Sequence, residues 1–343
     1  MDLALSPDER AIQEAFAALF EKESTPERVR AAAGAGFDPA LWSLLAELGA
    51  VGIGVPEHLG GAGAGLVELV LIAEEWGARA ACVPLVEAAT AARVLSAWAA
   101  APGVASLLER VVAGDAVAAF APRPPVDGVA RALPGGAVAD VIVALDGDDL
   151  VAVEDAPPGG RDDLGHLAVA DRPLAGPGVR RTVLAHGSDA HRAMAQARAE
   201  WRVATAGALA GLAREALDIG VRYARDRRQF GTAIGAFQAL QQPFADAVTA
   251  TDGAQLLARE AAWRMDRGLD GGDFLADVAY AHAARTAVDA AQLSLHVHGG
   301  YGYALEYDIH LYLLRATGLS LAAGDPDELW EEIGAASAMR AVA

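Results

Sequence analysis

Two segments near the C-terminal end combine residue types that suit an anionic ligand. Residues 225–231 read RDRRQFG, and residues 296–303 read HVHGGYGY. An arginine fork and exposed backbone N–H groups suit a pyrophosphate, and adjacent glycines such as Gly299 and Gly300 let something approach the backbone closely. The alternative is that both segments only end helices, with Gly231 and the Gly-Gly pair as C-terminal caps.

Other chemistry is poorly supported in the same region. His296 and His298 are two residues apart, so they do not share a helix face, and no carboxylate cluster lies beside them in the sequence. We therefore expect no metal site. The acids of DPDE, residues 325–328, fit an N-cap, a proline at the first helical position and a capping-box glutamate. This pattern predicts the start of a last helix rather than a catalytic group.

Composition excludes several classes of function. The chain has 343 residues, a formal net charge of −19 and one cysteine, Cys82. A nucleic-acid role is not expected because phosphate binding needs a basic face, and one cysteine allows no disulfide. We see no secretory signal at the N-terminus, and no apolar run reaches the roughly 18 residues of a membrane span. These features favour a cytoplasmic protein.

Three zones follow one another along the chain. Residues 1–113 show helical periodicity around a glycine-rich loop at 49–65, whose proline and glycines suit a tight turn. Residues 114–187 contain short β-like runs divided by Pro, Gly and Asp. Residues 188–343 contain long amphipathic helices that predict a four-helix bundle. The expected fold class is α+β, mostly α, with a helical domain, a shortened β domain and the bundle.

Three motifs resemble those of the acyl-CoA dehydrogenase family, and the resemblance covers essentially the whole chain. RYARDRRQFGTAIGAFQALQQPFADA, residues 222–247, matches the Arg-x-x-Phe-Gly, Ile-Gly-x-Phe-Gln and Ala-Asp pattern. HVHGGYGYALEYDIHLYLLRA, residues 296–316, is similar to the Gly-Gly-x-Gly-Tyr segment of a branch with Glu-x-Asp-x-His-Leu-Tyr-Leu. GAVGIGVPEHLGGAGAG, residues 49–65, matches the turn Pro-Glu-x-x-Gly-Gly-x-Gly.

The resemblance implies FAD as cofactor, an acyl-CoA substrate and an electron-transfer flavoprotein as acceptor. In the family a carboxylate removes the α-proton and flavin N5 accepts the β-hydrogen as hydride. The adenosine and pyrophosphate end of the FAD lies against a neighbouring subunit. By position, residues of this chain that match that end are Arg227 for the pyrophosphate, Phe230 and Gln238 beside the cofactor, His296 where the family has Gln, and Gly299 and Gly300.

The pattern for holding the flavin ring is missing. The family's β domain opens with Ala-x-Thr-Glu-Pro-x-x-Gly-Ser-Asp, whose Thr and Ser touch flavin and substrate. The corresponding stretch here, residues 116–136, reads AVAAFAPRPPVDGVARALPGG and contains neither Thr-Glu nor Gly-Ser-Asp.

The catalytic base of the family is also missing. Its usual place, a Tyr-Glu-Gly-Thr-like segment, corresponds to SLAAGDPDEL, with Ala323 or Gly324 at the base position. Some members carry the base before an Arg on the first bundle helix, where this chain has Trp201 before Arg202. Glu200 is one residue away, a helical rotation of about 100°, so its carboxylate is expected to point elsewhere unless the register shifts.

Three hypotheses follow. First, the chain resembles the non-catalytic partner of heteromeric, α2β2 actinobacterial acyl-CoA dehydrogenases that act on steroid side-chain thioesters, with no catalytic residue of its own. It would complete the FAD site of a paralogous chain. Second, it is a self-sufficient homo-oligomer with Glu200 as a displaced base. Third, it is a binding or scaffold protein without redox chemistry.

Overall fold

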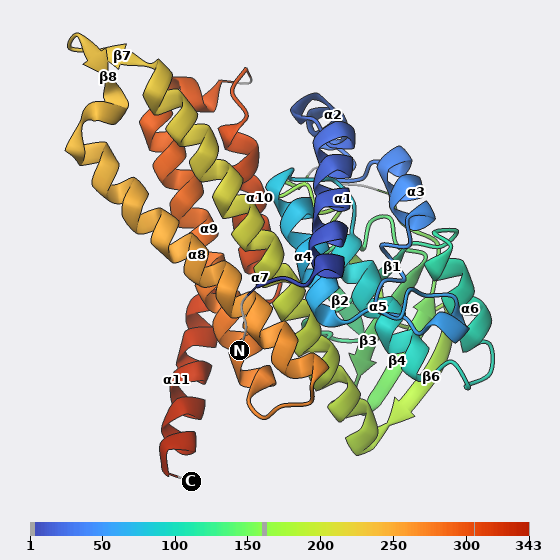
Figure 1. Cartoon of the computed structure of the whole chain (residues 1–343). Helices are drawn as coiled ribbons and strands as arrows, with labels where there is room; N and C mark the ends of the chain where they lie inside the picture. Colours follow the sequence, from blue (N-terminus) through green and yellow to red (C-terminus); the bar gives the residue numbers. More distant parts are fainter. Residues whose placement is uncertain (1–3, 160–162, 305, 343) are drawn as a thin grey trace.

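The structure is a computed structural model that describes residues 4–159, 163–304 and 306–342. Along the chain, a β region follows an N-terminal helical part and precedes a long C-terminal helical bundle. In space the N-terminal helices stand beside the bundle, and the strands lie on their other side (Figure 1). The N-terminal helices are α1 (Pro7–Glu23), α2 (Pro26–Ala32), α3 (Pro39–Glu47), η1 (Glu57–Leu59), α4 (Leu66–Ala78), α5 (Leu85–Ala97) and α6 (Val104–Val112).

The first helices begin where their capping residues predict. The Ser6 hydroxyl accepts the Glu9 N–H at 3.2 Å, and the Glu9 carboxylate accepts the Ser6 N–H at 2.6 Å. This reciprocal capping satisfies two N–H groups that the helix leaves free. Thr25 and Asp38 cap α2 and α3 in a similar way, each followed by proline at the first helical position.

The β region contains two small sheets. The larger has the strand order β1-β3-β4-β6, with β1 parallel to β3 and the other pairs antiparallel. The smaller pairs β2 with β5 in antiparallel fashion. The strands are β1 (Ala118–Phe120), β2 (Val129–Leu133), β3 (Val141–Asp146), β4 (Asp149–Glu154), β5 (Ala170–Pro173) and β6 (Arg180–His186). Buried apolar residues run through β1, β3 and β4, so both faces of this sheet are covered.

The C-terminal part confirms the predicted helical bundle. Helices α7, α8, α9 and α10 pack on one another, whereas α11 leaves the body of the molecule at the C-terminal end (Figure 1). The elements are α7 (Gly187–Asp226), β7 (Arg228–Gln229), β8 (Thr232–Ala233), η2 (Ile234–Ala236), α8 (Gln238–Asp266), α9 (Gly272–His298), η3 (Gly299–Tyr303), α10 (Ile309–Leu321) and α11 (Pro326–Val342). Among the described residues, none of these helices is both long and apolar enough to cross a membrane.

A close helix crossing joins the N-terminal part to the bundle. A Cβ added to Gly77 on α4 would lie 1.9 Å from the carbonyl oxygen of Ala208 on α7. A Cβ added to Gly211 would lie 1.9 Å from the carbonyl oxygen of Glu74. Both distances are shorter than any van der Waals contact, so α4 and α7 touch at backbone level only because both residues are glycine.

The structure corrects one local interpretation. Helix α7 ends at Asp226, and residues 228–233 form the antiparallel β7–β8 hairpin instead of continuing the helix to a cap at Gly231. Phe230 and Gly231 form the turn with φ of 52° and 81°. Two consecutive positive φ angles are typical of a tight hairpin turn. The boundaries drawn from composition, after 113 and after 187, stay an interpretation; α6 ends at Val112 and α7 begins at Gly187.

Candidate functional site

All six residues that match the far end of the family's cofactor site lie on the surface. Arg227 follows α7, Phe230 lies at the hairpin turn, Gln238 begins α8, and His296, Gly299 and Gly300 lie at the end of α9 and the start of η3; each is exposed. The β7–β8 hairpin and η3 lie at the same end of the bundle (Figure 1). The guanidinium carbon of Arg227 lies 5.7 Å from the ring centre of Tyr301.

This end of the bundle is basic in an acidic protein. Arg225, Arg227 and Arg228 are all exposed, and within the part of the chain that the structure describes none of them forms an ion pair. Guanidinium groups that are free of carboxylate partners can meet an external phosphate. The surroundings of the hairpin therefore suit an anionic group from outside the chain.

Phe230 has an unusual exposure and backbone. Its side chain is 94% exposed, and its φ of 52° is rare for a residue other than glycine. The only ring near it in the described residues is that of Phe237, at 6.2 Å between centroids. An aromatic side chain held outward on a strained turn is typical of a contact residue for another molecule.

The backbone conformation favours glycine at position 299 but not at position 300. Gly299 has a φ of 62°, which an L side chain rarely adopts, whereas Gly300 has no positive φ. A Cβ added to either would meet no atom of the described residues within 4 Å. No contact in that part of the chain therefore requires glycine at position 300.

An aromatic cluster fixes the backbone around these glycines. The rings of Tyr223 and His298 stack with centroids 4.1 Å apart, and Tyr307 packs against both. His298 Nδ1 donates to the carbonyl oxygen of Ser294 at 2.7 Å. His298 is thus a buried packing residue, while His296 points to the surface. No group of three or more potential metal ligands occurs among the described residues.

The two positions where the resemblance would place a base meet in the core. Trp201 is fully buried, and its ring centre lies 5.6 Å from that of Tyr280. The Tyr280 hydroxyl lies 2.9 Å from the carbonyl oxygen of Leu319, and it accepts the N–H of Ala323 at 3.4 Å. The Tyr280 side chain therefore links position 201 with position 323, and neither position carries a carboxylate.

Glu87 is a buried carboxyl that the sequence gave no reason to select. It lies on α5, and its Oε1 accepts the indole N–H of Trp201 at 3.3 Å. Burial raises the pKa of Glu87 above its usual value of 4.5, because the charged form loses its hydration. No motif marks this residue, and only the packing of α5 against α7 brings it to Trp201.

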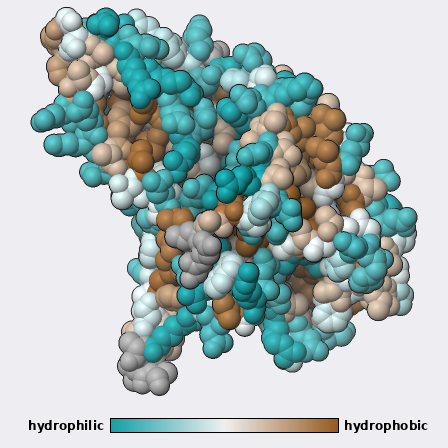
Figure 2. Space-filling view, in the orientation of Figure 1, coloured by the Kyte–Doolittle hydropathy of each residue, from teal (hydrophilic) through white to brown (hydrophobic). Residues whose placement is uncertain are grey.

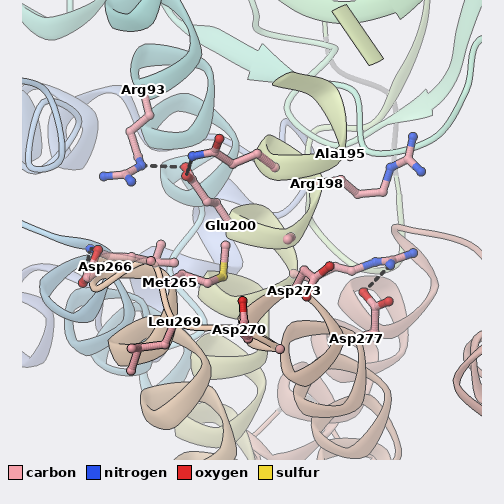
Figure 3. A pocket seen from close by; sticks show the side chains of 17 residues that line it. Arg93, Ala195, Arg198, Glu200, Met265, Asp266, Leu269, Asp270, Asp273 and Asp277 are labelled. Carbon is pink, nitrogen blue, oxygen red and sulfur yellow. Dashed lines mark hydrogen bonds and ion pairs between the residues drawn. The ribbon is translucent and has the colours of Figure 1, made fainter. Parts of the chain in front are cut away.

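Glu200 faces away from that cluster, into a surface cavity of about 800 Å³ (Figure 3). Its Oε2 lies 2.7 Å from Nε of Arg93, and Gln196 donates to its Oε1 at 3.0 Å. The side chain of Arg93 crosses the glycine-rich loop, since a Cβ at Gly54 would lie 2.2 Å from Nη1. The carboxylate of Glu200 is thus held by α5 and the loop rather than at the position of Trp201.

The stretch that would seat a flavin ring offers no side-chain hydroxyl. Residues 116–136 contain no Ser and no Thr, and β1 within it is buried along its whole length. Asp325 caps α11 as predicted, because the Asp327 N–H donates to its Oδ1 at 2.9 Å at the start of this helix. The exposed residues at the bundle end fit the tail of a flavin nucleotide. Residues 116–136, in the chain's own β region, do not fit the flavin ring.

Both helical parts of the chain match family profiles. Residues 6–115 match the profile described as acyl-CoA dehydrogenase, N-terminal domain, and residues 191–338 match acyl-CoA dehydrogenase, C-terminal domain. The chain is similar to acyl-CoA dehydrogenase IpdE2 of Mycolicibacterium smegmatis, with 30% identity over 331 residues that cover 94% of this chain and 97% of the relative.

Solved structures share the fold over the whole length. A variant of the steroid ACAD Tcur3481–Tcur3483 has a TM-score of 0.86 and 26% identity, covering 98% of this chain and 99% of that chain. The ChsE4–ChsE5 complex from Mycobacterium tuberculosis has a TM-score of 0.83 and 24% identity, with the same coverage. The second likeness supports the fold alone.

Proposed function

This chain belongs to the acyl-CoA dehydrogenase family, and from that premise we propose that it is the non-catalytic subunit of a heteromeric enzyme. Members of the family carry FAD, which when bound accepts a hydride from the acyl thioester. In the proposal this chain completes the FAD site of a paralogous subunit and contributes no base. The substrate would be a bulky acyl-CoA, such as a steroid side-chain thioester, with an electron-transfer flavoprotein as acceptor, in the cytoplasm.

One observation carries the proposal: the positions for a base meet at Tyr280, and they hold Trp201 and Ala323. General-base catalysis needs a proton acceptor within hydrogen-bond reach of the substrate carbon's proton. The α7 position that matches a base holds the fully buried indole of Trp201, and the carboxyl beside it, Glu87, accepts the indole N–H. A chain with this interior is suited to support another site rather than to remove a proton.

The exposed residues at the bundle end support a role in the cofactor site of a partner subunit. Arg227, Phe230 and the Gly299–Gly300 pair are open to solvent and are not explained by contacts within the chain. Guanidinium and backbone N–H groups are suited to a pyrophosphate. A heteromeric relative such as the ChsE4–ChsE5 complex gives the proposal a structural precedent in fold.

The test is flavin content with and without a partner. Purified alone, the chain should bind little FAD and show no dehydrogenase activity, because it lacks a ring seat and a base. Co-expressed with a paralogous subunit encoded beside it, it should form a complex with one FAD for each pair of unlike chains. Arg227→Gln should lower the FAD content of that complex, whereas Arg192→Gln, a change at the exposed opposite end of α7, should leave it unchanged.

A second function remains in competition because Glu200 lines a cavity large enough for a small molecule. In that case the chain is a homo-oligomeric acyl-CoA dehydrogenase with Glu200 as base. A yellow, active oligomer made from this chain alone would establish it and would refute the heteromeric proposal. Absence of flavin both alone and with every paralogous neighbour would instead favour a scaffold without redox chemistry.

A further inference from the structure

The cavity that Glu200 borders has features of a ligand site apart from the bundle end. Its floor is the outer face of α7, where Ala195 and Ala199 lie one turn apart and leave room above the helix. The opposite wall is the connection from α8 to α9, which includes Gly271 and Gly272. A volume of about 800 Å³ is in the range of small-molecule pockets.

One end of the cavity is cationic and incompletely satisfied. Arg198 and Arg202 both line the cavity, and they lie four residues apart on α7, on the same face of the helix. Figure 3 shows Arg198. Arg202 pairs with Asp277 at 2.5 Å, whereas Arg198 forms no ion pair within the described residues. The Nε atoms of both are buried and have no hydrogen-bond partner in the described part of the chain.

The positive charge of Arg202 disfavours the charged form of Arg198. Burial, followed by the positive charge of Arg202, lowers the pKa of Arg198, and the attraction of Asp277 and Glu332 does not offset this. Buried charged donors without an acceptor are unfavourable. An external anion beside Arg198 would supply the charge partner that this guanidinium lacks among the described residues.

The rest of the lining limits what can carry that anion. Leu66, Met265 and Leu269 supply an apolar section of the lining. Five carboxylates and three guanidinium groups line the cavity as a whole, so a ligand with several negative charges would meet net repulsion. Arg93 pairs with Glu200 and Arg202 pairs with Asp277, whereas Arg198 has no carboxylate partner among the described residues, so Arg198 is the group that can balance one negative charge.

We propose that this cavity binds a small free carboxylic acid, with its carboxylate on Arg198 and Arg202 and its apolar body against Met265 and Leu269. The planar guanidinium fork matches a carboxylate in two-point contact. This site goes beyond the proposed flavin function, because it needs neither the cofactor nor a partner subunit. The two proposals can therefore be tested separately.

The test is direct binding to the purified chain, or to its complex if the chain is obtained only as a complex. Titration of 3-phenylpropanoate, followed by calorimetry or ligand-observed NMR, should give saturable binding. The matched neutral amide 3-phenylpropanamide should bind at least about tenfold more weakly, since the carboxylate supplies the contact to arginine. Arg198→Gln should weaken carboxylate binding by a similar factor.

Two further variants keep the experiment decisive. Ala195→Trp would fill the floor without altering an arginine, so it should abolish binding even if Arg198→Gln does not fold. Arg285→Gln, a change of an exposed arginine on α9 that pairs with Asp289 and does not line this cavity, should leave binding unchanged. The proposal is wrong if the carboxylate does not bind at millimolar concentration, if Ala195→Trp binds it normally, or if inorganic pyrophosphate or coenzyme A binds this cavity as tightly.

Discussion

The indole N–H of Trp201 donates to Oε1 of Glu87 across 3.3 Å, and both side chains are buried in the core. Tyr280 closes the other side of the indole. We expect this pair to contribute to stability, because removing either buried side chain would leave a cavity or a buried polar group without its partner.

The first prediction concerns the size of that contribution. Trp201→Ala should lower the free energy of unfolding by about 3–5 kcal/mol, because removing a fully buried aromatic leaves a cavity. Denaturant unfolding measures this value. Trp263→Ala is the control, since Trp263 is only half-buried, beside Arg267, and should cost less. An equal loss in the two variants would show that Trp201 has no special packing role.

The second prediction concerns pH. Since burial raises the pKa of Glu87, the folded chain holds this proton more tightly than the unfolded chain does. The stability contributed by Glu87 is therefore complete below its unfolded pKa, near 4.5, and is lost as pH rises through the folded pKa. Glu87→Gln cannot ionise and still accepts the Trp201 N–H.

The measurement is the difference in unfolding free energy between Glu87→Gln and the unsubstituted chain as a function of pH. It should be constant below about pH 4.5 and should rise in favour of Glu87→Gln toward neutral pH. Glu47→Gln, at the exposed end of α3, is the matched control for loss of a glutamate. A difference that does not change with pH would mean that Glu87 is ionised in the folded chain.

Much of the fold could be predicted because its signals are local. The structure confirms three kinds of local signal: the capping at Ser6 and at Asp325, the helical periodicity of the bundle, and the three-part order. Each of these depends on residues that are neighbours in the sequence. The β7–β8 hairpin was not predicted, because arginine-rich helical periodicity runs up to Arg228 without a proline. Only the positive φ angles of Phe230 and Gly231 distinguish a hairpin from a capped helix.

The interior of the site could not be predicted for a different reason. Glu87, Trp201 and Tyr280 come from three helices far apart in the sequence, and no spacing rule connects them. Likewise, Gly54 suits a tight turn by sequence, but its structural reason is the side chain of Arg93 that passes over it. Such contacts depend on how helices pack, which periodicity alone does not determine.

The third prediction tests whether something from outside approaches the glycine pair. The added methyl group of Gly300→Ala would meet no atom within 4 Å in the part of the chain that the structure describes, and the position requires no positive φ. Its effect on the stability of the chain should therefore stay within about 0.5 kcal/mol. In the complex with a paralogous subunit it should lower FAD content, because a methyl group would occupy the space of the nucleotide tail.

The control for that variant is Gly334→Ala. Gly334 is exposed on α11 and also has open space around its Cβ position, so the substitution should stabilise the helix by about 1 kcal/mol without changing FAD content. If Gly300→Ala keeps full flavin occupancy, the glycine pair does not contact the cofactor. The measurement is the flavin absorbance per complex after gel filtration.

The fourth prediction separates the two enzymatic hypotheses at Glu200. Glu200→Gln removes the buried anion that Arg93 holds at 2.7 Å, so it should lower the free energy of unfolding by about 1–3 kcal/mol. If the partner subunit carries the base, kcat of the folded complex should not change. If Glu200 is the base, kcat should fall about 10²- to 10⁴-fold, with FAD content unchanged.

The double variant Arg93→Gln/Glu200→Gln isolates the structural part, because it removes both charges and should recover stability but not a lost proton acceptor. Recovery of kcat together with stability would therefore exclude Glu200 as a base, since a glutamine at that position cannot accept the α-proton.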